Sequence, residues 1–227
     1  STYARGLMFV IKRLLQISIL LLGLLFLIAC ADATGVPGAS GADVIFSDGF
    51  VPGQMDNWVM EGDNAGQTAV IDEHLVIDLA DNNIMQFSTL PDQTFDNFIL
   101  EVDAQLLEGD LGSSYGVLFR MQDTTRFYRF EITGDGLFMV ERRDGEAGWT
   151  RFVDRWTESA AIKQGLGSIN QLRVEALGTN ISLFVNDQLV HQFSDTAYSS
   201  GTIALDAGTF VQPQAKVAFD NVVVRRP

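Results

Sequence analysis

The stretch Tyr115–Thr133 reads YGVLFRMQDTTRFYRFEIT, and its side chains alternate between two faces on either side of a polar interruption. One face is expected to carry Tyr115, Val117, Phe119, Met121, Tyr128, Phe130 and Ile132. The other is expected to carry Gly116, Leu118, Arg120, Phe127, Arg129 and Glu131. A period of two residues is typical of β-strands, so the stretch predicts two neighbouring strands.

The same alternation recurs along the chain, for example in FILEVDAQL (98–106) and QLRVEA (171–176). Turn signals separate the runs at hairpin spacing: TGDG (133–136), RDGEAG (143–148), LGTN (177–180) and VND (185–187). The pattern predicts an all-β fold over residues 44–227, an antiparallel two-sheet jelly-roll sandwich of about a dozen strands. It indicates one short helix, over residues 159–164, and no second domain.

Charge and cysteine content exclude several classes of function. The formal net charge is −14, and so acidic a protein repels the phosphate backbone of nucleic acids. A single cysteine excludes an internal disulfide and cysteine-rich zinc sites, and His74 and His191 are too far apart in sequence to suggest a histidine cluster.

The N-terminal residues resemble a secretory signal. Lys12 and Arg13 precede an uncharged apolar run from 14 to 29, which predicts one hydrophobic helix. The run ends in Leu27-Ile28-Ala29-Cys30, which resembles a bacterial lipobox. We therefore expect a signal or anchor segment over residues 1–30, lipidation of Cys30, and a flexible linker over residues 31–43.

Two other interpretations of Cys30 stay open, an uncleaved signal anchor and a buried structural cysteine. Positive residues precede the apolar run, so the lipidated and the anchored forms both place the N-terminus inside the cell and the acidic domain outside it. The expected location is the extracytoplasmic face of a bacterial cell membrane, reached through the lipid or the helix.

The order of motifs resembles that of the concanavalin A-like lectin/glucanase superfamily. It is closest to bacterial extracytoplasmic domains grouped with family 16 glycosidases and with 3-keto-disaccharide hydrolases. The resemblance covers roughly residues 44–226. The segments that carry it are FSDGF (46–50), NWVMEG (57–62), DEHLVIDL (72–79), YGVLFRMQDTTRFYRFEITGDGLFMV (115–140), NQLRVEALGTNISLFVNDQLV (170–190), SGTIALDAG (200–208) and AFDNVVV (218–224). It implies a jelly roll whose curved face often binds sugars.

Family 16 glycosidases carry two glutamates and an aspartate at alternating positions of one strand face. In EVDAQL, Glu101 and Asp103 fit the first two positions, but the third is Gln105, or Leu106 if a bulge intervenes. Neither of these two can transfer a proton, so the acid and base pair of a retaining glycosidase is incomplete. Three interpretations of Glu101 and Asp103 therefore stay open: solvated residues of a half-buried strand, ligand-binding residues, or catalytic residues.

A second set of polar residues is Arg120, Arg129 and Glu131, expected on the polar faces of neighbouring strands. Such a set could bind vicinal hydroxyls or an acidic ligand, or could form a structural charge ladder. Trp149, in a glycine-rich loop region, is the tryptophan best suited to stack on a sugar ring. Trp58 and Trp156 suit packing roles.

Many jelly rolls of this superfamily hold a structural Ca²⁺. Asp48 and Asp220 lie near the two ends of the predicted domain and are candidate ligands, although calcium needs six to eight oxygens. No other cofactor is expected.

These observations favour a membrane-tethered, non-catalytic binding module whose partner is a carbohydrate. One alternative is an accessory or scaffolding subunit of a membrane protein complex. A third is a hydrolase of glycans or 3-keto-disaccharides.

Overall fold

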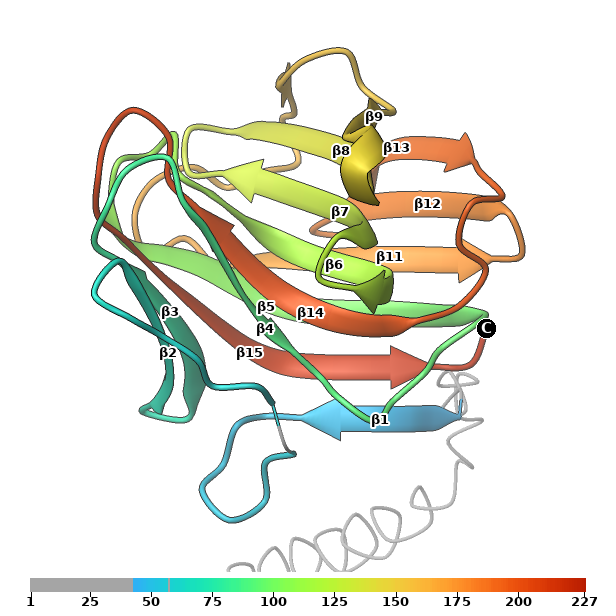
Figure 1. Cartoon of the computed structure of the whole chain (residues 1–227), viewed down its shortest axis with the longest axis horizontal. Helices are drawn as coiled ribbons and strands as arrows, with labels where there is room; N and C mark the ends of the chain where they lie inside the picture. Colours follow the sequence, from blue (N-terminus) through green and yellow to red (C-terminus); the bar gives the residue numbers. More distant parts are fainter. Residues whose placement is uncertain (1–42, 57) are drawn as a thin grey trace, which may run out of the picture. The chain divides into compact units, whose positions relative to one another are not determined.

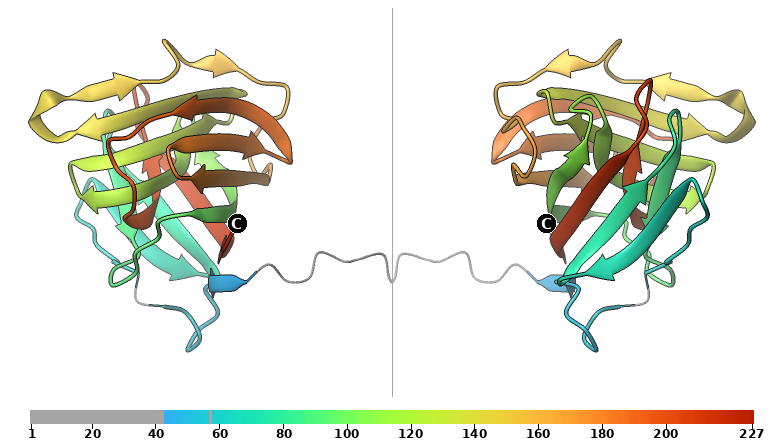
Figure 2. Two further views of the ribbon diagram at one scale, coloured as in Figure 1. Left: turned by 90° about the vertical axis from the view of Figure 1, so that its right-hand side faces the viewer. Right: turned by 90° about the vertical axis from the view of Figure 1, so that its left-hand side faces the viewer.

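The computed structural model describes residues 43–56 and 58–227, and these form two antiparallel sheets that pack face to face (Figure 1, Figure 2). The eight strands of one sheet are β1 (Val44–Asp48), β2 (Gly66–Ile71), β3 (His74–Leu79), β5 (Phe98–Gly109), β11 (Asn170–Leu177), β12 (Asn180–Val185), β13 (Gln188–Ser194) and β15 (Ala215–Arg225). The seven strands of the other are β4 (Met85–Thr89), β6 (Ser114–Asp123), β7 (Arg126–Thr133), β8 (Leu137–Asp144), β9 (Trp149–Arg151), β10 (Thr157–Glu158) and β14 (Thr202–Gly208).

The order of strands confirms the predicted sandwich. The eight-stranded sheet runs β13-β12-β11-β5-β15-β3-β2, with β1 beside β15. The seven-stranded sheet runs β10-β8-β7-β6-β14-β4, with β9 beside β8. All four predicted turns join neighbouring antiparallel strands, as the hairpin spacing indicated. Pairing of β1 with β15 joins the first and last strands of the described region.

The hydrophobic core lies between the sheets and follows from the alternation of each strand. In β5, Phe98, Leu100 and Val102 are buried in it, while the intervening Glu101 and Asp103 are partly exposed on the other face. Each large apolar side chain buried in this way contributes about 1.5–3 kcal/mol. We call the face of each sheet that is turned away from this core its outer face.

The short helix predicted over residues 159–164 is wrong, and the segment is an irregular loop. Ala161 and Ile162 are buried against the core. The buried side chain of Asn170 accepts a hydrogen bond from Lys163 N (2.8 Å) and donates one to Lys163 O (3.0 Å). Asn186 donates a further bond to Ala161 O (2.8 Å). These side chains satisfy backbone groups that a helix would otherwise have paired.

The predicted N-terminal helix, Cys30 and most of the linker lie outside the described residues. Within residues 43–56 and 58–227, no helix has the length and apolar character needed to cross a membrane.

Gly116, in the middle of β6, is a point of close backbone approach between β6 and β7. It pairs with Glu131 on β7 and with Asp206 on β14. A Cβ atom at this position would overlap the carbonyl oxygen of Phe130 and lie 2.8 Å from Glu131 Cα. Only glycine fits here without a shift of the β7 backbone.

Replacing Gly116 with alanine should therefore destabilise the domain by about 2–3 kcal/mol or more, because backbone atoms would have to move. Gly178→Ala is the matched control. Gly178 has a φ of 57° and no atom within 4 Å of its would-be Cβ, so only backbone strain of about 1 kcal/mol is expected. Chemical denaturation followed by tryptophan fluorescence measures both. Equal losses in the two variants would contradict the steric role of Gly116.

Candidate functional site

Strand β7 presents two charged residues on the outer face of the seven-stranded sheet. Tyr128, Phe130 and Ile132 occupy the core side of this strand, so Arg129 and Glu131 must lie on the other. The same rule places Glu141 of β8 beside Arg129, its register partner, and Asp206 of β14 beyond Gly116. We call Arg129, Glu131, Glu141 and Asp206 the Arg129 cluster.

Arg129 is the centre of this cluster. Its Nη2 lies 2.6 Å from Glu131 Oε1 and 2.6 Å from Asp206 Oδ2, and its Nε donates a hydrogen bond to Asp206 Oδ2 (2.8 Å). Its Nη1 lies 3.6 Å from Glu141 Oε1. Glu131 and Asp206 belong to strands on opposite sides of β6, so the guanidinium bridges them across Gly116. Arg129 and Glu131 thus share one face of β7, as the alternation predicted, and they form an ion pair there.

Burial decides the protonation of the cluster. Only 1% of Glu131 and 0% of Asp206 are exposed. Loss of hydration raises the pKa of Glu131 to about 8; Arg129 opposes this rise, and the negative charge of Asp206 adds to it. Burial likewise raises the pKa values of Asp206 and Glu141. Burial acts to lower the pKa of Arg129, but the attraction of Asp206 and Glu131 outweighs it, so that pKa lies above its usual value.

A pocket of about 440 Å³ opens above this cluster, and we call it the Trp149 pocket. Residues 83–85 and 208–210 line it, as do Trp149 and Arg151 of β9, with Arg129 and Glu141 from the strands between them. Glu141 Oε2 lies 3.9 Å from Arg151 Nε. The pocket therefore combines a charged floor with walls from loops and from an edge strand.

Two aromatic side chains of the pocket are exposed, Trp149 to 41% and Phe210 to 43%. Trp149 packs edge to face against Phe127, with ring centroids 5.9 Å apart, and the guanidinium carbon of Arg143 lies 5.2 Å from its ring centre. Phe210 packs in the same way against Trp156, at 5.8 Å. Both rings are thus supported by neighbours while part of their surface stays open to a ligand.

Glu101 and Asp103 do not belong to this site. They lie on the outer face of the other sheet, where Arg225 Nε donates to Glu101 Oε2 (3.2 Å) and Asn221 Nδ2 donates to Asp103 Oδ2 (3.0 Å). A role in ligand binding for these two stays a prediction, and the contacts are those of a half-exposed strand surface.

The prediction that Arg120 shares a face with Arg129 and Glu131 is wrong. Pairing of β6 with β7 is irregular after Phe119, and Arg120 has a φ of 47°, which interrupts the alternation. Its guanidinium instead donates to the carbonyl oxygens of Tyr198 (3.2 Å) and Asp96 (3.0 Å). Gly201 makes room for this bulge, since a Cβ there would overlap the Arg120 and Met121 backbone.

A calcium ion bound by Asp48 and Asp220 stays a prediction, and the contacts of Asp48 do not favour it. Asp48 Oδ1 accepts Phe50 N (2.7 Å), and its Oδ2 accepts Asp56 N (2.7 Å) and Trp58 Nε1 (3.0 Å), so protein donors already occupy both oxygens. In the described ranges, 43–56 and 58–227, no group of three or more His, Cys, Asp and Glu side chains is placed to hold a metal ion. The side chain of Trp58 is buried in the core, as its predicted packing role requires.

Sequence reasoning missed Glu141, Arg151, Asp206 and Phe210. Two signals were present. In LFMVERRD, Glu141 is two residues after Met139, so strand alternation places both side chains on the same face. In TIALDAG, Asp206 is the only charged residue of an otherwise apolar strand. A charged residue within an otherwise apolar strand indicates a buried ion pair, because an unpaired charge there would be too costly.

Comparison with known proteins places the domain among carbohydrate-related folds. A family model described as a 3-keto-alpha-glucoside-1,2-lyase-like domain matches residues 42–225. No curated protein matches the chain. The carbohydrate-binding module CBM66 from Bacillus subtilis superposes with a TM-score of 0.60 at 18% identity, covering 76% of this chain and 97% of that one.

Two further solved structures share the fold. A Bacillus subtilis protein of unknown function with a galectin-like fold has a TM-score of 0.61 at 11% identity, covering 81% of this chain and 96% of that one. The catalytic domain of an endo-1,3-beta-glucanase (laminarinase) from Thermotoga petrophila has a TM-score of 0.57 at 12% identity, covering 80% and 96%. Identities this low establish the fold alone. The family match spans most of the sequence, and this chain belongs to the 3-keto-alpha-glucoside-1,2-lyase-like domain family.

Proposed function

We propose that the domain binds carbohydrate in the Trp149 pocket. The observation that carries the proposal is the position of exposed Trp149 and Phe210 around a floor formed by Arg129 and Glu141. Sugar rings offer apolar C–H faces that stack on aromatic rings and hydroxyls that both donate and accept hydrogen bonds. Arg129 supplies donors, Glu141 supplies acceptors, and Arg151 lies at the same wall.

The Arg129 cluster would hold these polar groups in place before a ligand arrives. Three carboxylates surround the Arg129 guanidinium, so its orientation costs little further entropy on binding. The names of the structural neighbours, a carbohydrate-binding module and a glucanase, support a saccharide ligand. We further propose that the domain acts outside the cell membrane, tethered through Cys30, as the N-terminal sequence indicates.

A second candidate function is elimination on a 3-keto-glucoside, which the family description suggests. Glu141 is the one carboxylate among the described residues that lines the pocket, and its pKa is raised by burial. The ketone at C3 acidifies the C2–H bond, so Glu141 could remove that proton while the C1–O bond breaks. A C1–C2 double bond forms, and the departing oxygen takes a proton from Glu141. Glycoside hydrolysis would need two carboxylates, and Glu131 and Asp206 are buried beneath the floor.

Removal of the stacking ring tests the binding proposal. Trp149→Ala should weaken saccharide binding roughly 3- to 10-fold, since an aromatic contact contributes about 0.5–1.5 kcal/mol beyond the area it buries. Phe184→Ala is the matched control, because Phe184 is a partly exposed aromatic residue beside Arg173 (4.1 Å) on the other sheet. A glycan array followed by titration calorimetry measures both. Unchanged affinity in Trp149→Ala, or an equal loss in Phe184→Ala, would contradict the assignment.

The variant Glu141→Gln distinguishes the two candidate functions, saccharide binding and elimination. Glutamine keeps a hydrogen-bonding side chain of similar size but cannot take up a proton. A binding module should retain saccharide affinity to within about tenfold, with no turnover of a 3-keto-glucoside in either protein. A lyase should lose at least about 100-fold in kcat while KM changes little. Product formation can be followed by the absorbance of the enone.

The raised pKa of Glu131 predicts how stability depends on pH. Because the folded-state pKa (about 8) lies above the usual value of 4.5, the protonated form is favoured by folding. The resulting stability is present below pH 4.5 and is lost as pH rises through 8. The melting temperature should fall over this window, and Glu131→Gln should flatten the fall relative to Glu158→Gln, an exposed control on β10. If the melting temperatures of the two variants fell in parallel with pH, Glu131 would not be a buried acid that is neutral in the folded state.

A further inference from the structure

A second pocket, of about 370 Å³, lies among the loops at the end of β6, away from the Trp149 pocket. It is lined by Asp96 and Asn97 before β5, by Arg120, by the turn between β11 and β12, and by residues 195–200 before β14. No residue of this lining is shared with the Trp149 pocket. We call it the Arg120 pocket.

Arg120 is placed here by an unusual backbone conformation. Its φ of 47° costs about 1–3 kcal/mol in a residue other than glycine, and such strain concentrates at functional sites. The side chain is only 1% exposed. No carboxylate in the described part of the chain forms an ion pair with it, and its Nε has no hydrogen-bond partner there. A buried guanidinium that lines a pocket with a donor to spare is suited to bind a ligand acceptor.

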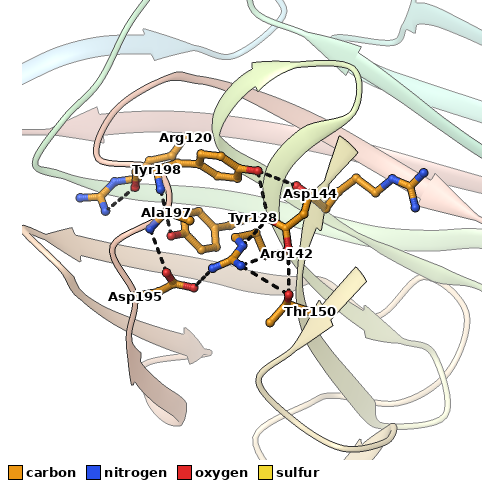
Figure 3. A network of polar contacts seen from close by, with 9 residues as sticks. Arg120, Tyr128, Arg142, Asp144, Thr150, Asp195, Ala197 and Tyr198 are labelled. Atoms are coloured by element: carbon orange, nitrogen blue, oxygen red, sulfur yellow. Dashed lines mark hydrogen bonds and ion pairs between the residues drawn. The ribbon is translucent and has the colours of Figure 1, made fainter. Parts of the chain in front are cut away.

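The walls of this pocket are held in place by a network that Figure 3 shows. Tyr198 N donates to the Tyr128 hydroxyl (3.3 Å), and the Tyr198 hydroxyl donates to Arg143 O (3.0 Å). Arg142 forms an ion pair with Asp195, which also accepts Ala197 N (2.9 Å). The loop of residues 195–200 is thus fixed to β7 through Tyr198 and to β8 through Asp195 and Tyr198, so the pocket is formed before a ligand binds.

The charges of the lining restrict the class of ligand. Asp96 would repel an anion, buried Arg120 would repel a cation, and Asp195 is already paired with Arg142. Hydroxyls of Thr179, Thr196 and Ser199 add groups that both donate and accept hydrogen bonds. A neutral polyol satisfies donors and acceptors together without an unpaired charge. We propose that the Arg120 pocket is a second binding site for a neutral saccharide, which makes the domain bivalent for carbohydrate.

The two sites would act together on a glycan surface. Two weak sites on one rigid domain raise the overall affinity for a polymer through a high effective concentration, although each site alone binds weakly. The second site does not depend on the first, since the two pockets share no lining residue.

Hydrogen–deuterium exchange of the full chain in detergent micelles tests the proposal. The probes are glucose, galactose, mannose and fructose at about 100 mM, with glucuronate and glucosamine as anionic and cationic comparisons. At least one neutral sugar should slow exchange in the segments 94–98, 177–181 and 194–201, about twofold when its concentration equals the dissociation constant. The charged sugars should slow it less.

Three variants locate the effect. Thr196→Trp, at an exposed lining position, should fill the pocket and abolish the protection, while Gln188→Trp, an exposed position on β13 outside both pockets, should leave it unchanged. Trp149→Ala should also leave it unchanged and should remove protection only near residues 149 and 208–210. Melting temperatures check that each variant is folded.

The proposal is overturned if no neutral sugar protects the three segments, if glucuronate protects them more strongly, or if the protection persists in Thr196→Trp. Protection of these segments without any near Trp149 would reject the first site and keep the second.

Discussion

A guanidinium buried on the outer face of a β-sheet has to meet opposite charge, because an unpaired buried ion costs several kcal/mol. Arg129 meets this constraint with Glu131 and Asp206, each 2.6 Å away, from strands on opposite sides of β6. Gly116 lies between these strands, and β7 approaches it so closely that a Cβ atom there would overlap the Phe130 carbonyl oxygen. The floor of the Trp149 pocket, and the fixed orientation of Arg129 and Glu141 in it, follow from this one arrangement.

The cluster holds more acid than base, and this imbalance shapes its chemistry. One guanidinium cannot neutralise three carboxylates in a region with little water, so Glu131 retains its proton up to a pKa of about 8. Because Glu131 and Asp206 lie beneath the floor, Glu141 is the only one of these three carboxylates that can contact a ligand. A single reachable carboxylate beside an exposed tryptophan suits recognition of hydroxyls better than hydrolysis of a glycosidic bond.

The two pockets show where strand alternation predicts the direction of a side chain correctly and where it does not. It correctly placed Arg129 and Glu131 on one face of β7, because an uninterrupted strand alternates its side chains. It failed for Arg120, two residues past Leu118 on β6, because a bulge opposite Gly201 turned that side chain into a different pocket. Nothing in the run YGVLFRM marks the bulge, since the glycine that accommodates it, Gly201, lies just before β14, about 80 residues further along the chain.

Local pattern was enough to establish the all-β sandwich, its turns and the direction in which most side chains point, because alternation and turn chemistry depend on near neighbours in the chain. Which sheet a polar residue belongs to depends on strand pairing between distant segments. Glu101 and Asp103 therefore lie on the sheet opposite the Trp149 pocket, while Asp206, 77 residues after Arg129 in the sequence, forms both an ion pair and a hydrogen bond with it. These long-range pairings also decide how deeply each carboxylate is buried and how far its pKa is raised. They therefore decide that Glu131 and Asp206 support the site from below, while Glu141 can contact a ligand.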